Sequence, residues 1–126
     1  MNKILVEISV GELLDKISIL KIKKEKIKDP EKLKFIDDEY KVLKNQLDNN
    51  IKSDKKLDDL FEALKKINLK LWVIEDEKRM CEKNSDFGNK FIQLSRNVYK
   101  NNDKRAKIKS DINKLLGSNI KEVKSY

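Results

Sequence analysis

The residues best placed to do chemistry are polar side chains that interrupt the apolar stripes of predicted helices. Lys78 interrupts one stripe, and Asn101 and Arg105 interrupt the stripe of the following helix. If these two helices pair antiparallel about the turn near residue 87, Asn101 and Arg105 face the stretch around Leu69 and Val73. We therefore expect a polar cluster between the two helices, buried or half-buried.

Spacing along the same two helices brings further polar groups to this cluster. Glu75, Asp76 and Arg79 on the first helix come within about one helical turn of the second, where they approach a set of polar residues: Arg96, Tyr99, Asn102 and Asp103. One interpretation is a paired ionic network that fixes the register of the helices. The other is a ligand pocket lined by carboxylates and guanidinium groups.

Four carboxylates are the candidates for a metal site. Glu12 and Asp15 lie three residues apart near the N-terminus, and with Glu75 and Asp76 they offer the oxygen ligands that Mg²⁺ prefers. Glu12 already has a role in a helix cap, and acidic pairs at this spacing are common in so charged a chain. We therefore expect no metal and no cofactor.

Composition excludes several kinds of site. The 126 residues contain no histidine, so imidazole acid/base chemistry, Ser-His or Cys-His nucleophiles and histidine metal sites are excluded within one chain. Cys81 is the only cysteine, and its helical setting predicts a buried side chain in a reducing compartment. The N-terminal residues match neither a signal peptide nor a membrane span, so we expect a cytoplasmic protein without a membrane partner.

The formal charge of +8 is unevenly distributed. Residues 1–28 and 84–126 carry the excess, residues 53–83 are balanced, and residues 29–52 have one more acidic than basic residue. In the last predicted helix, Lys100, Lys104 and Lys107 form a tight basic ridge. This ridge is either a solvated face or a site for an anionic ligand such as phosphate or nucleic acid.

Apolar residues recurring at alternating three- and four-residue steps, as in coiled coils, predict an all-α fold in one domain. The fold is expected to be a four-helix bundle of two antiparallel hairpins, one of them long, with helices at about residues 10–28, 30–48, 54–83 and 89–116 and a tail at 118–126. Ser9 and Glu12 form a predicted capping box, and Gly117 suits the C-terminal cap of the last helix.

The N-terminal residues show a different period. Ile4, Val6 and Ile8 recur with a period of two, which allows one short strand. The tail, residues 120–126, is the partner with which that strand could pair.

The chain resembles a domain-of-unknown-function family of small helical proteins from bacteria and phages. The resemblance rests on segments at residues 9–20 (SVGELLDKISIL), 29–33 (DPEKL), 71–76 (LWVIED), 86–88 (DFG), 98–106 (VYKNNDKRA) and 124–126 (KSY). It implies which polar residues belong to the family pattern, namely Glu12, Asp15, Lys16, Glu75, Asp76, Asn102, Asp103, Arg105 and Tyr126. It also implies that the tail folds back and is held, but it carries no activity, ligand or catalytic residue.

Spacing and resemblance together define the candidate site, whose catalytic residues, if any, are unassigned. Its members are Glu12, Asp15, Lys16, Glu75, Asp76, Arg79, Tyr99, Asn102, Asp103, Arg105 and Tyr126.

We expect a non-catalytic helical binding or assembly protein that forms a homo-oligomer, because long amphipathic hairpins leave apolar faces that one pair of short helices does not cover. Its polar cluster is a candidate site for a small anionic ligand. The first alternative is an Mg²⁺-dependent enzyme acting on a nucleotide or phosphorylated substrate, although only Glu12-x-x-Asp15 matches half of the acidic motifs of all-α nucleotide pyrophosphohydrolases. The second is nucleic-acid binding through the basic last helix.

Overall fold

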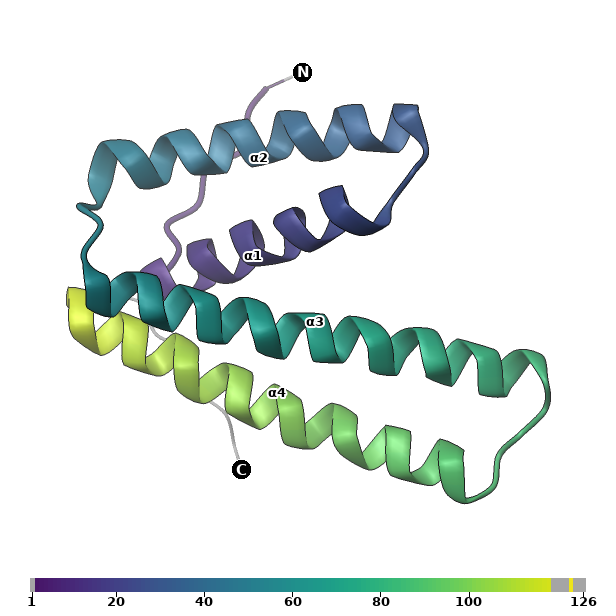
Figure 1. Cartoon of the computed structure of the whole chain (residues 1–126). Coiled ribbons are helices and arrows are strands. Elements are labelled where there is room, and N and C mark those ends of the chain that lie inside the picture. Colours follow the sequence, from purple (N-terminus) through teal and green to yellow (C-terminus); the bar gives the residue numbers. More distant parts are fainter. Residues whose placement is uncertain (1, 119–122, 124–126) are drawn as a thin grey trace.

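The computed structural model describes residues 2–118 and residue 123, and this part of the chain contains four α-helices (Figure 1). They are α1 (Val10–Lys26), α2 (Pro30–Asn50), α3 (Lys55–Lys83) and α4 (Asn89–Leu116). The all-α prediction is confirmed. Every helix starts within one residue of its expected start and ends within two residues of its expected end.

Local capping signals explain why the helix boundaries could be read from the sequence. The Ser9 hydroxyl accepts a hydrogen bond from the Glu12 amide at 3.1 Å, which satisfies one of the orphan amides of the first turn of α1. Asp29 and Asp54 cap α2 and α3 in the same way. Gly117 ends α4 in the left-handed conformation, with φ of 65°.

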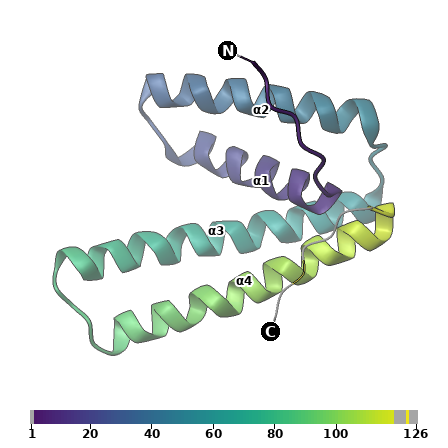
Figure 2. The same cartoon turned by 180° about the vertical axis from the view of Figure 1, so that it is seen from behind.

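The helices are arranged in layers around α1. This helix contacts α2 on one side and both α3 and α4 on the other, whereas α2 has α1 as its helical neighbour. Figures 1 and 2 show α2 and α1 lying over one half of the long α3–α4 hairpin, while the turn end of that hairpin projects beyond them. Within the described part of the chain, much of the hairpin therefore has no covering helix.

The hydrophobic core lies where α1 crosses the hairpin. Leu14, Leu57, Leu64 and Ile112 form its buried centre, and none is more than 4% exposed. Side chains from the end of α2, including Leu47, pack against this cluster. Toward the turn the hairpin buries little more than Cys81 and Leu94. The predicted burial of Cys81 is confirmed.

The N-terminal strand prediction is wrong for the residues that the structure describes. Residues 2–8 form no strand, and Ile4, Leu5 and Val6 are 89%, 88% and 74% exposed. A strand requires a neighbouring strand for its backbone hydrogen bonds, and no strand is found in the described part of the chain. The expected pairing with residues 120–126 lies outside the described residues, apart from Val123.

Candidate functional site

The centre of the site is the carboxylate of Asp15, which is 1% exposed although it belongs to a surface-seeking residue type. One of its oxygens accepts from Asn68 Nδ2 at 2.8 Å and from Arg105 Nε at 2.9 Å. The other oxygen accepts from Arg105 Nη2, and Lys109 Nζ lies 3.8 Å from it. Asp15 therefore joins three helices, α1, α3 and α4.

Further hydrogen bonds extend this arrangement along α1. Ser18 Oγ donates to the Asp15 carbonyl and accepts from Asn68, both at 2.8 Å. Lys109 Nζ donates to Glu12 Oε2 at 2.7 Å. Together with Asn102, which lies 3.4 Å from Arg105 Nη1, these residues form what we call the buried polar network: Glu12, Asp15, Ser18, Asn68, Asn102, Arg105 and Lys109.

The Glu12 carboxylate occupies a position different from the expected one. The capping box prediction has it reach back to the Ser9 amide, but its oxygens lie against Lys109 and, at 3.7 Å, Lys16. That half of the capping box is missing from the hydrogen bonds of the described residues. The Lys109 side chain is only 10% exposed, and its ion pair with Glu12 across the two helices takes the place of the local contact.

The start of α1 is pressed against the end of α4. The Gly11 amide donates to Asn113 Oδ1 at 2.7 Å, and the Val10 amide donates to Ser118 Oγ at 3.1 Å. A Cβ atom at Gly11 would lie 2.6 Å from the Lys109 carbonyl oxygen. Only glycine permits this approach, which brings Glu12 and Asp15 to α4.

The network is closed. Within the described part of the chain, no buried side-chain nitrogen or oxygen lacks a hydrogen-bond partner. Burying charges costs free energy unless they are paired and hydrogen-bonded, and here they are. The buried polar atoms of the network are therefore satisfied by partners within the chain.

Three of the expected site residues lie beside the network in an open pocket. Glu75, Asp76 and Arg79 line a cavity of about 360 Å³ with Trp72 and Arg105, at the C-terminal end of α1. Arg105 thus has one side in the network and one side in the pocket. Among the described residues no salt bridge holds Glu75, Asp76 or Arg79.

Other expected members of the cluster lie elsewhere. Asp103 lines a groove on the other face of the hairpin. It precedes Arg105 by two residues, and this separation turns its side chain by about 200° around the axis of α4. Tyr99 is 53% exposed. Tyr126 lies outside the described residues, as does the expected return of the tail.

The other two interruptions of the apolar stripes have local explanations. Lys78 Nζ lies 5.7 Å from the centre of the Phe91 ring, a cation–π contact across the hairpin. Asn101 Nδ2 donates to the Asn97 carbonyl one turn earlier at 2.8 Å. Only Arg105 of the three belongs to the buried polar network.

The four carboxylates suggested for Mg²⁺ do not converge. Glu12 and Asp15 face Lys109 and Arg105, whereas Glu75 and Asp76 line the neighbouring pocket. Across the described residues, no group of three or more acidic or cysteine side chains is placed to hold a metal. Glu12 and Asp15 are neutralised by side chains of α4 and, for Glu12, also by Lys16 of α1.

Three network residues were not predicted from the sequence: Ser18, Asn68 and Lys109. A signal for Asn68 was present, because it lies four residues after Leu64 and three before Leu71, on the same buried face of α3. Lys109 follows Arg105 by four residues and precedes Ile112 by three, which places it on the inner face of α4 in the same way.

The opposite face of the α3–α4 hairpin carries a long groove. Its volume is about 1230 Å³, and all its lining residues come from α3 and α4. The floor is mostly apolar, with Ile67, Val73 and Ile74 of α3 and Ile108 of α4. Four lysines line it as well, and we call this surface the lysine-rimmed groove: Lys66, Lys70, Lys104 and Lys107, together with Asp103.

The exposed ionic contacts of α1 and α2 differ from the buried network. Asp37 lies 2.9 Å from Lys41 Nζ and 3.3 Å from Lys24 Nζ, and Lys24 also lies over the Tyr40 ring. Hydrogen bonds from Lys41 and then Lys24 hold the pKa of Asp37 below its usual value. The same contact with Asp37 raises the pKa of Lys41.

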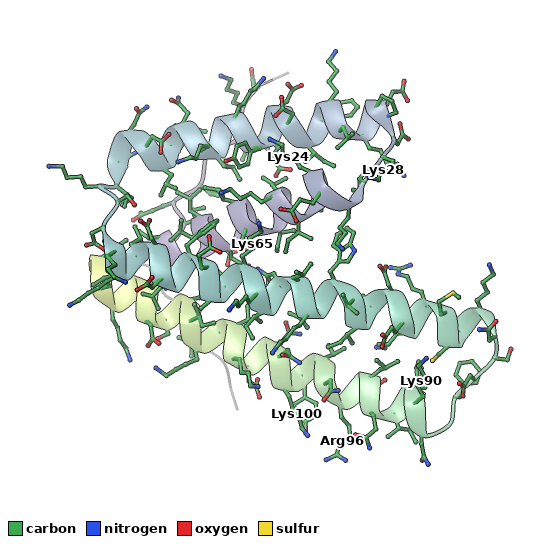
Figure 3. The ribbon with its side chains drawn as sticks, viewed as in Figure 1. Lys24, Lys28, Lys65, Lys90, Arg96 and Lys100 are labelled. Carbon is green, nitrogen blue, oxygen red and sulfur yellow. The ribbon has the colours of Figure 1, made fainter. Side chains whose placement is uncertain are left out.

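The basic side chains of α4 are spread over two sides of the helix. Lys104 and Lys107 line the groove, and Lys107 pairs with Asp111 at 2.6 Å. Figure 3 shows Arg96 and Lys100 along the edge of α4 that points away from the other helices. The predicted ridge of Lys100, Lys104 and Lys107 is therefore shared between the groove and this outer edge.

Comparisons with known proteins place nearly the whole chain in one family. A family profile described as a family of unknown function, DUF6165, matches residues 4–126. No curated protein and no solved structure matches significantly. No described helix has the length and apolar character needed to cross a membrane.

Proposed function

The chain belongs to DUF6165, a family of unknown function, and we propose that it is a non-catalytic helical assembly protein that associates with further copies of itself. The observation that carries this proposal is the lysine-rimmed groove. It is a channel with an apolar floor between two long helices, and none of the described helices covers it. The hydrophobic core lies at the other end of the hairpin from its turn. A groove that combines an apolar floor with charged groups along its sides is a candidate interaction site.

The disposition of Glu12 and Asp15 supports a non-catalytic role for these two carboxylates. A general base or a metal ligand needs a carboxylate that can reach a substrate or an ion. Asp15 is 1% exposed and held by Asn68 and Arg105, and Glu12 is held by Lys109. These carboxylates stabilise the packing of α1 on the hairpin instead.

The oligomeric state of the purified protein tests the proposal. We expect sedimentation velocity in low salt to show a species larger than the monomer that grows with protein concentration. Val73, which is 44% exposed on the groove floor, is the residue to change: Val73→Lys places a charge there and should abolish association. Met80→Lys is the matched control, because Met80 is 55% exposed on the same helix but does not line the groove.

The result that would overturn the proposal is a parent protein that stays monomeric up to high micromolar concentration. Equal loss of association in Val73→Lys and Met80→Lys would show that the groove is not the contact surface. Circular dichroism of both variants verifies that each is folded.

Binding of a small anionic ligand is a second candidate, favoured by the pocket of Trp72, Arg79 and Arg105. Arginine guanidinium groups recognise carboxylates and phosphates well. Calorimetric titration with inorganic phosphate, pyrophosphate and a nucleoside triphosphate tests it. Binding that weakens in Arg79→Ala but not in Lys83→Ala would support the pocket, and absence of heat with all three anions would remove it.

A further inference from the structure

The proposed self-association raises the question of which surface of a second copy enters the groove. Lys66, Lys70 and Lys104 line the groove, and among the described residues no salt bridge neutralises them. A partner surface must therefore combine apolar side chains with negative charge. This further inference rests on the proposed function.

The outer face of α2 has that combination. Phe35 is 76% exposed and Val42 is 63% exposed, although both are large apolar side chains on an otherwise polar surface. They lie seven residues apart, two helical turns, and so share one face of α2. The same face carries three exposed carboxylates, and we call it the acidic α2 face: Glu31, Phe35, Asp38, Glu39 and Val42.

We propose that the acidic α2 face of one copy docks in the lysine-rimmed groove of the next copy. The groove extends from Ala63 to Ile74 along α3, about 17 Å at 1.5 Å per residue. Glu31 to Val42 covers the same length of α2, so Phe35 and Val42 reach the apolar floor together. Docked in this way, α2 becomes the third helix of a bundle with α3 and α4.

Charge distribution favours this pairing over two others. Residues 29–52, which contain α2, are the one segment with more acidic than basic residues. Two grooves facing each other would bring together lysines of both copies, which repel. The exposed N-terminal residues Ile4, Leu5 and Val6 lie between one lysine and one glutamate, Lys3 and Glu7, and so offer no net negative charge to the rim.

The geometry of this contact predicts how assembly proceeds. The two surfaces are different, so the contact is heterologous, and every added copy presents one free groove and one free α2 face. Assembly therefore continues past the dimer as protein concentration rises, unless the copies close into a ring. It weakens as salt is added, because exposed lysine and carboxylate groups face each other at the rim.

A pair of complementary variants tests the inference. Val73→Lys blocks the groove and leaves the α2 face intact, whereas Phe35→Lys blocks the α2 face and leaves the groove intact. Each variant alone should raise the dissociation constant by at least about tenfold and behave as a monomer. An equimolar mixture should form a 1:1 dimer that does not grow, because only one productive contact remains.

Each alternative outcome has its own signature in sedimentation velocity. A parent protein that never associates overturns the proposed function and this inference together. A parent that associates while Phe35→Lys also associates normally overturns the inference alone, because another surface then makes the contact. If Phe35→Lys still assembles and a chain lacking residues 2–8 does not, the N-terminal residues are the occupant and the inference is wrong.

Discussion

The two faces of the α3–α4 hairpin are built from the same two helices but differ in the burial and pairing of their charged side chains. On the face beneath α1, Asn68 and Arg105 hold the buried carboxylate of Asp15. On the other face, Lys70 and Lys104 remain at the surface beside an apolar floor. The charges on the first face are paired with one another, whereas Lys70 and Lys104 on the second face have no salt bridge with any described residue.

This difference follows from where α1 lies. A buried carboxylate is tolerated only where cations and amide donors converge on it, and α1 brings Asp15 to such a place. Because the hydrogen bonds to Asp15 come from α3 and α4 together, a shift of α1 by one turn would break them all. The network therefore fixes the register of α1 on the hairpin. The groove has no such partner among the residues that the structure describes.

We expect removal of the Asp15 carboxylate to cause the largest loss in the free energy of unfolding. Asp15→Ala removes one of the two acceptors of Asn68 Nδ2 and the negative charge that faces Arg105 and Lys109, at a cost of about 3–5 kcal/mol in the free energy of unfolding. Chemical denaturation measures it. Asp48→Ala is the control, because its salt bridge with Lys44 is exposed and is expected to contribute less than about 1 kcal/mol.

Equal losses in Asp15→Ala and Asp48→Ala would contradict the distinction between the two faces. Asp15→Asn provides a finer comparison. It keeps one oxygen to accept from Asn68 but lacks the charge, so its stability should fall between those of the parent and Asp15→Ala.

The close approach of α1 to α4 gives the next prediction. Gly11→Ala would normally stabilise a helix, but here the new Cβ would lie 2.6 Å from the Lys109 carbonyl oxygen and 2.9 Å from Asn113 Oδ1. Since both belong to α4, the helices must separate, and we expect a loss of about 1–3 kcal/mol in the free energy of unfolding. Gly88→Ala, whose Cβ meets only Asp86 Oδ1 at 3.6 Å, should cost less than about 1 kcal/mol.

An unchanged or higher stability of Gly11→Ala would mean that α1 can move away from α4 without cost. In that case the short distances around Asp15 would not define the register of α1. Thermal unfolding of both glycine variants, measured in the same buffer, separates these outcomes.

The helices could be predicted because their signals are local. Ser9 and Asp29 cap with their own side chains, and Gly117 has no Cβ to oppose the left-handed conformation. Arg105 could be singled out because it breaks an apolar stripe. These features depend on neighbours within one or two helical turns, so the sequence alone contains them.

The rest of the candidate site depends on where α1 crosses the hairpin. Asn68 and Lys109 become network residues only because Asp15 is placed between them, and Asp103 leaves the cluster because α4 turns it to the other face. An uncovered apolar face could be expected from the short length of the first pair of helices. Which face of the hairpin remains uncovered could not be predicted, because the tertiary position of α1 decides it.

The smallest expected effect concerns Asp37, an exposed counterpart of Asp15 that also lies between two cations. Hydrogen bonds from Lys41 and Lys24 keep its folded-state pKa below the ordinary value of 3.8, so its contribution to stability is fully present above that pH and is lost as the pH falls further. The raised pKa of Lys41 makes the same contact weaken as the pH rises above 10.5.

Unfolding midpoints of the parent and Asp37→Asn should differ slightly at neutral pH and converge in acid. Because both partners are exposed, added salt should also reduce this difference, whereas the effect of Asp15→Ala should persist in salt. A difference for Asp37→Asn that survives both acid and salt would show that exposure does not separate the two kinds of ion pair in this protein.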